Sequence, residues 1–204
     1  MTLPANLQSI LPMRLCVFCG SSHGHHPRYA DAARALGQQL AGRGIGVVYG
    51  GGNVGLMGVL ADAALAGGGE VVGVIPHALF AKELGHTAIT DLRIVQTMHQ
   101  RKSLMAELSD GFIALPGGFG TLDELCEILT WAQLGIHHKP CALLNVDGYF
   151  DGFLQFLDSA VAEGFLRGEH RALLIVAQEI GDMLQQMSTY RSPIHDQWLT
   201  PDQT

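Results

Sequence analysis

The chain has 204 residues, of which 48% are apolar and only 15% are charged, and its formal net charge is −7. This length suits one domain with a sizeable core. The negative charge argues against a general nucleic-acid-binding protein, which would carry a basic face, so an anionic ligand would need a local cluster of donors.

The sequence contains no stretch of roughly 18 unbroken apolar residues, the length that crosses a membrane. Its first residues, MTLPANLQSILPMR, lack the basic region followed by a long apolar one that marks a signal peptide. We therefore expect no membrane association and a cytoplasmic location.

Short apolar runs alternate with helical patterns along the chain. The runs are rich in Leu and β-branched residues, which is typical of strands covered by helices on both faces of a parallel sheet. Repeated strand–helix units predict an α/β fold: a single Rossmann-like, doubly wound domain over residues 1–190, then a flexible tail at 191–204. The predicted strands are 15–18, 46–49, 71–75, 92–95, 112–115, 142–144 and 173–176, and the predicted helices are 27–41, 56–66, 99–108, 122–134, 150–163 and 179–187.

Two features near the first strand raise the question of a metal site. Cys16 and Cys19 have the C-x-x-C spacing of zinc or redox sites, but residues three apart on a strand point to opposite faces. We interpret both as small buried hydrophobic side chains. His23, His25 and His26 have no acidic or Cys partner at a matching spacing nearby, which favours an exposed loop, so we expect no metal.

Three predicted strands are followed by loops rich in Gly or Ser. These are Gly20 to Ser22 after the first strand, YGGGNVGLMG at 49–58 after the second, and PGGFGT at 116–121 after the fifth. Ligands of doubly wound folds bind beyond the carboxyl ends of the strands. The three loops therefore predict a phosphate-bearing ligand, with Ser21 as one candidate contact.

The loop after the second strand contains G-x-G-x-x-G at Gly50, Gly52 and Gly55. The acid that would bind a dinucleotide ribose at a strand end about 20 residues on is missing, because Glu70 falls at a strand start. We therefore exclude a nicotinamide cofactor. Gly51 and Gly52 are candidate contacts where backbone approaches a ligand, and a tight turn with no ligand is an equal alternative.

The stretch ALPGGFGTLDEL at 114–125 is more specific. Thr121 fits the N-cap of the helix 122–134, whose first N–H groups and dipole would attract a phosphate. Glu124 has two interpretations. It completes a T-x-x-E capping box with Thr121, or it acts beside a bound sugar, where a carboxylate orients water or stabilises a cationic transition state.

Arg101 and Lys102 lie in MHQRKSLM at 98–105, in the first turn of a predicted helix. Cations at this position oppose the helix dipole. A solvated helix face would explain them without a ligand, whereas the functional interpretation is a grip on phosphate and hydroxyl groups.

Together, CVFCGSS, YGGGNVGLMG, MHQRK and PGGFGTLDE resemble the Lonely Guy (LOG) family over about residues 15–176. These enzymes, long mislabelled as lysine decarboxylases, cleave the N-glycosidic bond of a cytokinin riboside 5′-monophosphate or of AMP to give free base and ribose 5-phosphate. The resemblance implies that Arg101 and Glu124 are the catalytic pair and that the protein is at least a homodimer. The nucleotide contacts it implies, with Gly117 added from the same loop, are Glu83, Lys102, Gly117, Gly118, Phe119, Gly120, Thr121, Leu122, Asp123 and Thr130.

Two further observations bear on the resemblance. The family pattern often reads T-L-E-E, and Asp123 replaces the first of these acids, which leaves its role open. The apolar residues of the helix 122–134 spread over more than one stripe, which supports a dimer.

The expected mechanism follows from the charge that develops in the reaction. Cleaving a ribosyl C–N bond builds positive charge on the sugar, so Glu124 would favour that charge and orient or deprotonate the attacking water. Arg101 would hold phosphate or ribose and keep the carboxylate ionised. No metal or organic cofactor is required.

Three alternatives stay open. A nucleotide-binding sensor or carrier would use the same loops without turnover, and a broader nucleosidase would differ only in base preference. A pyridoxal-phosphate lysine decarboxylase would need a lysine that forms a Schiff base with the cofactor. Lys102, beside Arg101, is the only lysine that the sequence places at the predicted site. Candidates for the base pocket, each more often a core residue, are Met57, His77, Met98 and Trp131.

Overall fold

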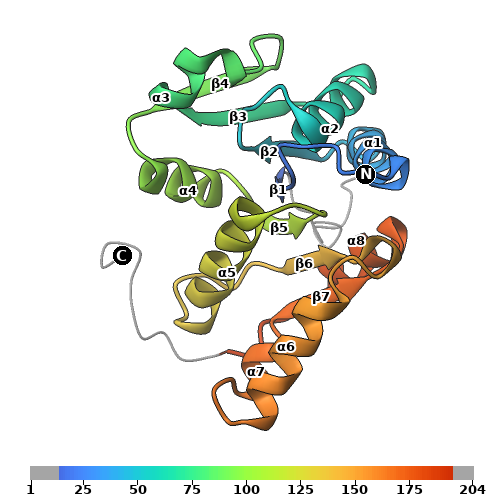
Figure 1. The fold of residues 1–204 in the computed structure, drawn as a ribbon, viewed down its shortest axis with the longest axis vertical. Helices are drawn as coiled ribbons and strands as arrows, with labels where there is room; N and C mark the ends of the chain where they lie inside the picture. The colour runs from blue at the N-terminus through green and yellow to red at the C-terminus, as the bar shows by residue number, and fades with distance from the viewer. Residues whose placement is uncertain (1–13, 195–204) are drawn as a thin grey trace, which may run out of the picture.

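A seven-stranded parallel sheet forms the centre of the protein (Figure 1). The structure, a computed structural model, describes residues 14–194, without the side chains of residues 83 and 84. The strand order is β4-β3-β2-β1-β5-β6-β7, which confirms the predicted Rossmann-like, doubly wound fold. The strands are β1 (Arg14–Phe18), β2 (Gly46–Tyr49), β3 (Val71–Pro76), β4 (Asp91–Val95), β5 (Gly111–Ala114), β6 (Cys141–Leu144) and β7 (Leu174–Ala177).

Six long helices lie where the sequence pattern predicted them, with ends that differ by at most three residues. Four short elements were missed, because a helix of three to five residues is too short to show a 3.6-residue period. The long helices are α1 (Pro27–Gly42), α2 (Gly55–Ala66), α4 (Met98–Glu107), α5 (Phe119–Gln133), α6 (Asp151–Ala162) and α8 (Ile180–Thr189), and the short elements are α3 (His77–Leu79), the π-helical η1 (Phe80–Leu84), the 3₁₀-helical η2 (Val146–Gly148) and α7 (Gly168–Arg171).

The core has two layers, one on each face of the sheet. Residues of α1, α2 and α8 pack on one face, where Leu36, Leu60 and Met183 are fully buried. Residues of α4, α5 and α6 pack on the other, where Met105 and Leu125 are buried. Both faces of every central strand are therefore covered, which explains why the strands are apolar without alternation.

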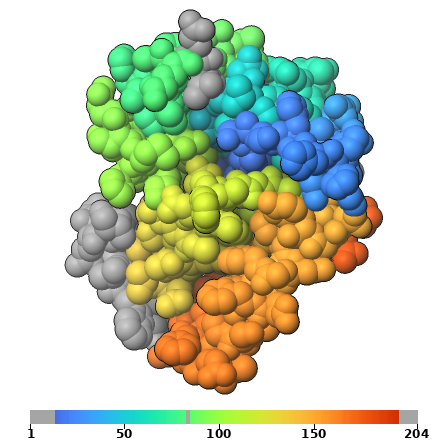
Figure 2. All heavy atoms as spheres, in the orientation of Figure 1, coloured from blue at the N-terminus to red at the C-terminus, as the bar shows by residue number. Residues whose placement is uncertain are grey.

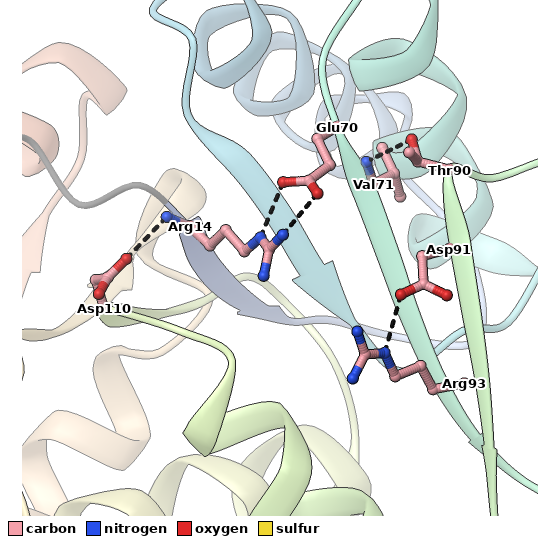
Figure 3. Close-up of polar contacts among 7 residues, drawn as sticks. All are labelled: Arg14, Glu70, Val71, Thr90, Asp91, Arg93 and Asp110. Carbon is pink, nitrogen blue, oxygen red and sulfur yellow. Dashed lines mark hydrogen bonds and ion pairs between the residues drawn. The ribbon is translucent and has the colours of Figure 1, made fainter.

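Polar contacts join the strands at their amino ends (Figure 3). The Arg14 guanidinium binds the Glu70 carboxylate through two hydrogen bonds, of 2.8 Å from Nε and 2.7 Å from Nη2. The Arg14 N–H donates to Asp110 Oδ2 at 3.0 Å, and Thr90 Oγ1 accepts from the Val71 N–H at 3.0 Å. These contacts connect β1 with the residues that immediately precede β3 and β5, and β3 with the residue that precedes β4.

The structure describes only part of each end of the chain. Ile194, inside the predicted flexible tail, is buried against Ala132 and Leu173. The remainder of that tail, 195–204, and residues 1–13 of the predicted domain lie outside the described residues. Across 14–194, no helix combines the length and apolar character needed to cross a membrane.

Candidate active site

A cavity of about 350 Å³ lies beyond the carboxyl ends of the central strands. Strand β1 lies between β2 and β5, so the connections that follow β1 and β5 diverge to opposite faces of the sheet and leave a crevice there. In Figure 2 the yellow-green surface of the segment after β5 borders the blue surface of the segment after β1. The residues that line the cavity are Val17, Cys19, Gly20, Ser21, Gly50, Gly52, Val54, Met57, Ile75, Leu79, Arg101, Gly118, Phe119, Gly120, Thr121 and Glu124.

The helix at the rim of this cavity begins earlier than the sequence predicted. Gly118 is the N-cap of α5, and the Leu122 N–H donates to the Gly118 carbonyl at 3.1 Å. The prediction that Thr121 caps the helix is therefore wrong, because the glycines allow the chain to enter the helix one turn sooner. The first-turn N–H groups of Phe119, Gly120 and Thr121 have no intrahelical acceptor and can receive an anion.

Open space surrounds two glycines of this loop. A Cβ added to Gly118 or to Gly120 would meet no atom within 4 Å, although both residues line the cavity. Gly117 differs, because a Cβ there would collide with Thr121 Oγ1. Gly117 is thus required by packing, while the space beside Gly118 and Gly120 can admit a ligand.

Arg101 is buried at the floor of the cavity, with 9% of its surface exposed. It is the fourth residue of α4, at the end of the first turn. Its Nε donates to the Val74 carbonyl at 3.2 Å, and its Nη2 donates to the Gly50 carbonyl at 3.4 Å. A Cβ at Gly50 would collide with this guanidinium, so glycine at position 50 makes room for Arg101.

Glu124 faces Arg101 across the floor, with 3.4 Å between Oε1 and Nη1. It is the sixth residue of α5, one turn too far into the helix to reach the N-cap, so the capping-box interpretation is wrong. Burial raises the pKa of Glu124, and the nearby Arg101 charge offsets this only in part. Arg101 therefore favours the ionised carboxylate, as expected, but its charge does not cancel the effect of desolvation.

Lys102 points away from the cavity. Its Nζ lies 3.0 Å from Glu127 Oε1 and 3.2 Å from Asp123 Oδ2. Burial lowers the pKa of Lys102, but the hydrogen bonds to these two carboxylates outweigh it and the net shift is upward. An ammonium group held by two carboxylates is a poor amine nucleophile, which argues against the Schiff-base alternative.

The structure brings together some of the predicted site residues and separates others. Arg101, Glu124, Ser21, Gly52 and the residues from Gly118 to Thr121 line one cavity. Predicted residues that do not line it are Gly51, Lys102, Gly117, Leu122, Asp123 and Thr130. The prediction for Glu83 falls on a side chain outside the described ones.

The residues outside the cavity have other contacts. Gly51 has a φ of +72°, and a Cβ there would press on Ile75 and Val74, so this glycine serves a tight turn against β3. Leu122 packs toward α6. Thr130 Oγ1 donates to the Cys126 carbonyl at 2.7 Å and lies in a separate groove between α5 and α6.

The apolar wall of the cavity was largely missed by the sequence. Of four base-pocket candidates, Met57 lines the cavity, whereas His77, Met98 and Trp131 do not. Ile75 and Leu79 complete the wall. Leu79 is in a three-residue helix after β3, and nothing in its local pattern distinguishes it from an ordinary core residue.

The cysteines near β1 are buried and the histidines that follow it are exposed, as the sequence predicted. Cys16 and Cys19 pack into the cores on opposite faces of the sheet, and burial raises the pKa of both thiols. His23, His25 and His26 are exposed. Within residues 14–194, no three His, Cys, Asp or Glu side chains are placed to hold a metal ion.

Comparison with known proteins identifies the family. Residues 57–187 match the family model described as "Possible lysine decarboxylase". A probable cytokinin riboside 5′-monophosphate phosphoribohydrolase of Oryza sativa subsp. japonica is 54% identical over 183 residues, which cover 90% of this chain and 74% of the relative. The cytokinin riboside 5′-monophosphate phosphoribohydrolase of Arabidopsis thaliana is 49% identical over 187 residues, 92% of this chain and 86% of that one. The chain belongs to the Lonely Guy (LOG) family.

Solved structures share the fold of this LOG-family chain at lower identity. The molybdenum cofactor carrier protein of Chlamydomonas reinhardtii superposes with a TM-score of 0.65 at 23% identity, over 84% of this chain and 93% of that one. The molybdenum cofactor binding protein of Rippkaea orientalis gives a TM-score of 0.65 at 20% identity, over 86% and 95%. At this identity the likeness is one of fold alone.

Proposed function

We propose that this LOG-family protein hydrolyses the N-glycosidic bond of a nucleoside 5′-monophosphate to free base and ribose 5-phosphate. The observation that carries the proposal is a buried carboxylate, Glu124, in the same cavity as the open first turn of α5. The names of relatives that are about 50% identical to this chain support the same reaction class.

The first step of the proposed reaction is anchoring of the phosphate. The N–H groups at the start of α5 and the helix dipole supply the attraction that a chain of net charge −7 cannot supply globally. Ser21 lines the same cavity as this turn and can contact the same group. Binding energy from the phosphate then holds the ribose in place for the reaction.

The second step is attack by water on the anomeric carbon. Burial raises the pKa of Glu124, which makes its carboxylate a stronger base than an exposed one. Glu124 accepts a proton from the water as the water oxygen bonds to the ribose carbon. The electron pair of the broken C–N bond leaves with the nucleobase. The same negative charge stabilises the cationic sugar of the transition state.

Arg101 orients Glu124 and the ribose. Two of its N–H groups are used by the carbonyls of Val74 and Gly50, which fixes the guanidinium plane. Nη1 lies 3.4 Å from Glu124 Oε1 and 3.9 Å from Met98 Sδ, and because Arg101 lines the cavity its guanidinium can bind a ribose hydroxyl or a phosphate oxygen.

The base fits the apolar side of the cavity. Met57, Val54 and Leu79 offer an apolar wall for a purine. We propose both cytokinin riboside monophosphates and AMP as substrates, a homodimer as the assembly, and a cytoplasmic location.

The test is chromatography of the products after incubation with AMP and with isopentenyladenosine monophosphate, each beside its nucleoside. We expect base and ribose 5-phosphate from the monophosphates and little release from the nucleosides, because nucleosides lack the anchoring phosphate. Equal rates on adenosine and AMP would contradict the phosphate-anchored site. Tight AMP binding with no product would favour a nucleotide sensor instead.

A further inference from the structure

The peptide bond between Gly117 and Gly118 decides which polar group the loop after β5 presents. Neither residue has a side chain, so the backbone bonds on either side of this planar peptide can rotate widely and the peptide plane can flip. The peptide is trans, and in a trans peptide the C=O and the N–H point in opposite directions. One orientation offers a donor to the cavity, and the flipped orientation offers a carbonyl that would repel a phosphate.

A hydroxyl group from a distant segment holds this peptide. Tyr149 Oη donates a hydrogen bond of 2.7 Å to the Gly117 carbonyl, from 32 residues further along the chain. The preceding carbonyl, of Pro116, accepts from the Gly20 N–H at 3.0 Å. Both carbonyls at the start of the loop are therefore occupied by donors of neighbouring segments.

Tyr149 lies beside the loop but does not line the active-site cavity. It lines an adjacent hollow of about 270 Å³ with Tyr29 and Gly117, whereas the cavity with Arg101 and Glu124 includes Gly118 but neither Tyr149 nor Gly117. Because the Gly117 carbonyl points toward Tyr149, the Gly118 N–H points away from Tyr149, and Gly118 lines the cavity that holds the catalytic pair.

The position of Tyr149 is itself fixed by a polar turn. The buried Asn145 donates from Nδ2 to Asp151 Oδ1 at 2.7 Å and accepts from the Phe150 N–H at 2.8 Å. Asp147 adopts a left-handed φ of 50°, a conformation that costs free energy in a residue other than glycine. Such a turn places the next side chain, Tyr149, in a defined direction.

Aromatic contacts hold the ring of Tyr149 on both sides. It packs edge-to-face on Tyr29, with ring centroids 5.4 Å apart, and on Phe150 at 4.9 Å. Arg28, next to Tyr29, forms an ion pair with Asp147 of the turn. The start of α1 and the turn before α6 thus fix the hydroxyl against the loop.

We propose that Tyr149 is a positioning residue of the phosphate site, whose hydroxyl holds the Gly117–Gly118 peptide with its N–H directed at the ligand. The proposal rests on the proposed function, which supplies the phosphate. Tyr149 acts through the loop and does not touch the substrate.

The experiment compares Tyr149→Phe with the matched control Tyr29→Phe. Both variants lose one hydroxyl and keep a ring in the same aromatic cluster, but the hydrogen bond to the loop comes from Tyr149. Binding of ribose 5-phosphate, AMP and adenine is measured by calorimetry in a Glu124→Gln background, so that no turnover interferes. Melting temperatures establish that each variant is folded.

For Tyr149→Phe we expect the Kd of ribose 5-phosphate and of AMP to rise about tenfold, which corresponds to about 1.4 kcal/mol, with the Kd of adenine unchanged. Tyr29→Phe should change none of the three. In ¹⁵N spectra, the Gly118 amide should shift on addition of ribose 5-phosphate to the parent protein and shift less in Tyr149→Phe.

Three results would overturn the proposal: equal affinities in Tyr149→Phe and its parent, an equal loss for adenine, or an equal loss in Tyr29→Phe. Failure of the unmodified protein to release base from AMP would instead count against the proposed function, while the phosphate-binding comparison still decides the role of Tyr149. A parent protein that binds neither AMP nor ribose 5-phosphate would overturn both.

Discussion

Two Arg–Glu pairs lie at opposite ends of the same sheet and behave differently. At the amino ends, Arg14 and Glu70 form two hydrogen bonds of 2.7 and 2.8 Å, and both side chains are about one-third or more exposed (Figure 3). At the carboxyl ends, Arg101 and Glu124 meet at a single distance of 3.4 Å, and both are buried.

The pKa shifts of the two glutamates have opposite signs. The hydrogen bond from Arg14 lowers the pKa of Glu70, whereas burial raises the pKa of Glu124 despite Arg101. Arg14 and Glu70 satisfy each other's hydrogen bonds and join β1 to the start of β3. The Arg101–Glu124 pair keeps unused hydrogen-bonding capacity beside a cavity, at a cost in desolvation, which is typical of groups that act on a ligand.

The largest expected difference is between Glu124→Gln and Glu70→Gln. Glu124→Gln should lower kcat on AMP by about 10²- to 10⁴-fold, because it removes the base, while the melting temperature stays near that of the parent. Glu70→Gln should leave kcat unchanged and lower the free energy of unfolding by about 0.2–1 kcal/mol. Product release and urea unfolding measure the two effects. If Glu124→Gln turned over AMP at the wild-type rate, the Arg101–Glu124 pair would have a structural role only, like the Arg14–Glu70 pair.

Arg101→Ala and Lys102→Ala distinguish the roles of two adjacent cationic residues. Arg101→Ala should lower kcat/KM on AMP by about 10²- to 10³-fold, since it removes preorganised donors from the cavity. Lys102→Ala should have a small effect, because Lys102 faces Asp123 and Glu127. Steady-state kinetics on both variants checks this. Equal losses would indicate that Lys102 turns into the cavity when a nucleotide binds.

Gly120→Ala tests whether the open space at the carboxyl ends belongs to a ligand. Gly120 and Gly152 are each the second residue of a helix, and a Cβ would meet no atom within 4 Å at either position. Both alanine variants should gain about 0.5–1 kcal/mol of stability. Only Gly120→Ala should raise KM for AMP, by about tenfold, a change of about 1.4 kcal/mol. An unchanged KM would place the phosphate elsewhere.

The smallest effect is the pH dependence of stability. The contribution of Glu70, whose folded pKa is lowered, is present above its unfolded pKa and is lost as the pH falls through the folded value. The contribution of Glu124, whose folded pKa is raised, is present below its unfolded pKa and is lost as the pH rises through the folded value. Urea unfolding of the parent and the two Gln variants from pH 3 to pH 7 should give differences of opposite slope. Slopes of the same sign would contradict the assigned shifts.

The sequence determined the fold and the family. Seven apolar runs without alternation, most of them separated by a helical pattern, predict a parallel sheet covered on both faces, because burial on both sides requires apolar residues throughout a strand. The motifs around Arg101 and Glu124 carried the family resemblance. Cys16 and Cys19 were correctly read as buried, since strand geometry alone sends them to opposite faces.

Only the tertiary structure decided the details of the site. The order of strands brings α4 and α5 together, so Arg101 and Glu124 meet although 23 positions separate them, and burial there sets the direction of the Glu124 pKa. The turning of Lys102 toward Glu127 and the contact from Tyr149 to Gly117 both depend on segments that are distant in sequence. Local sequence patterns indicate which segments form helices and strands. Desolvation, ion pairing and peptide orientation depend instead on residues that become neighbours only when the chain folds.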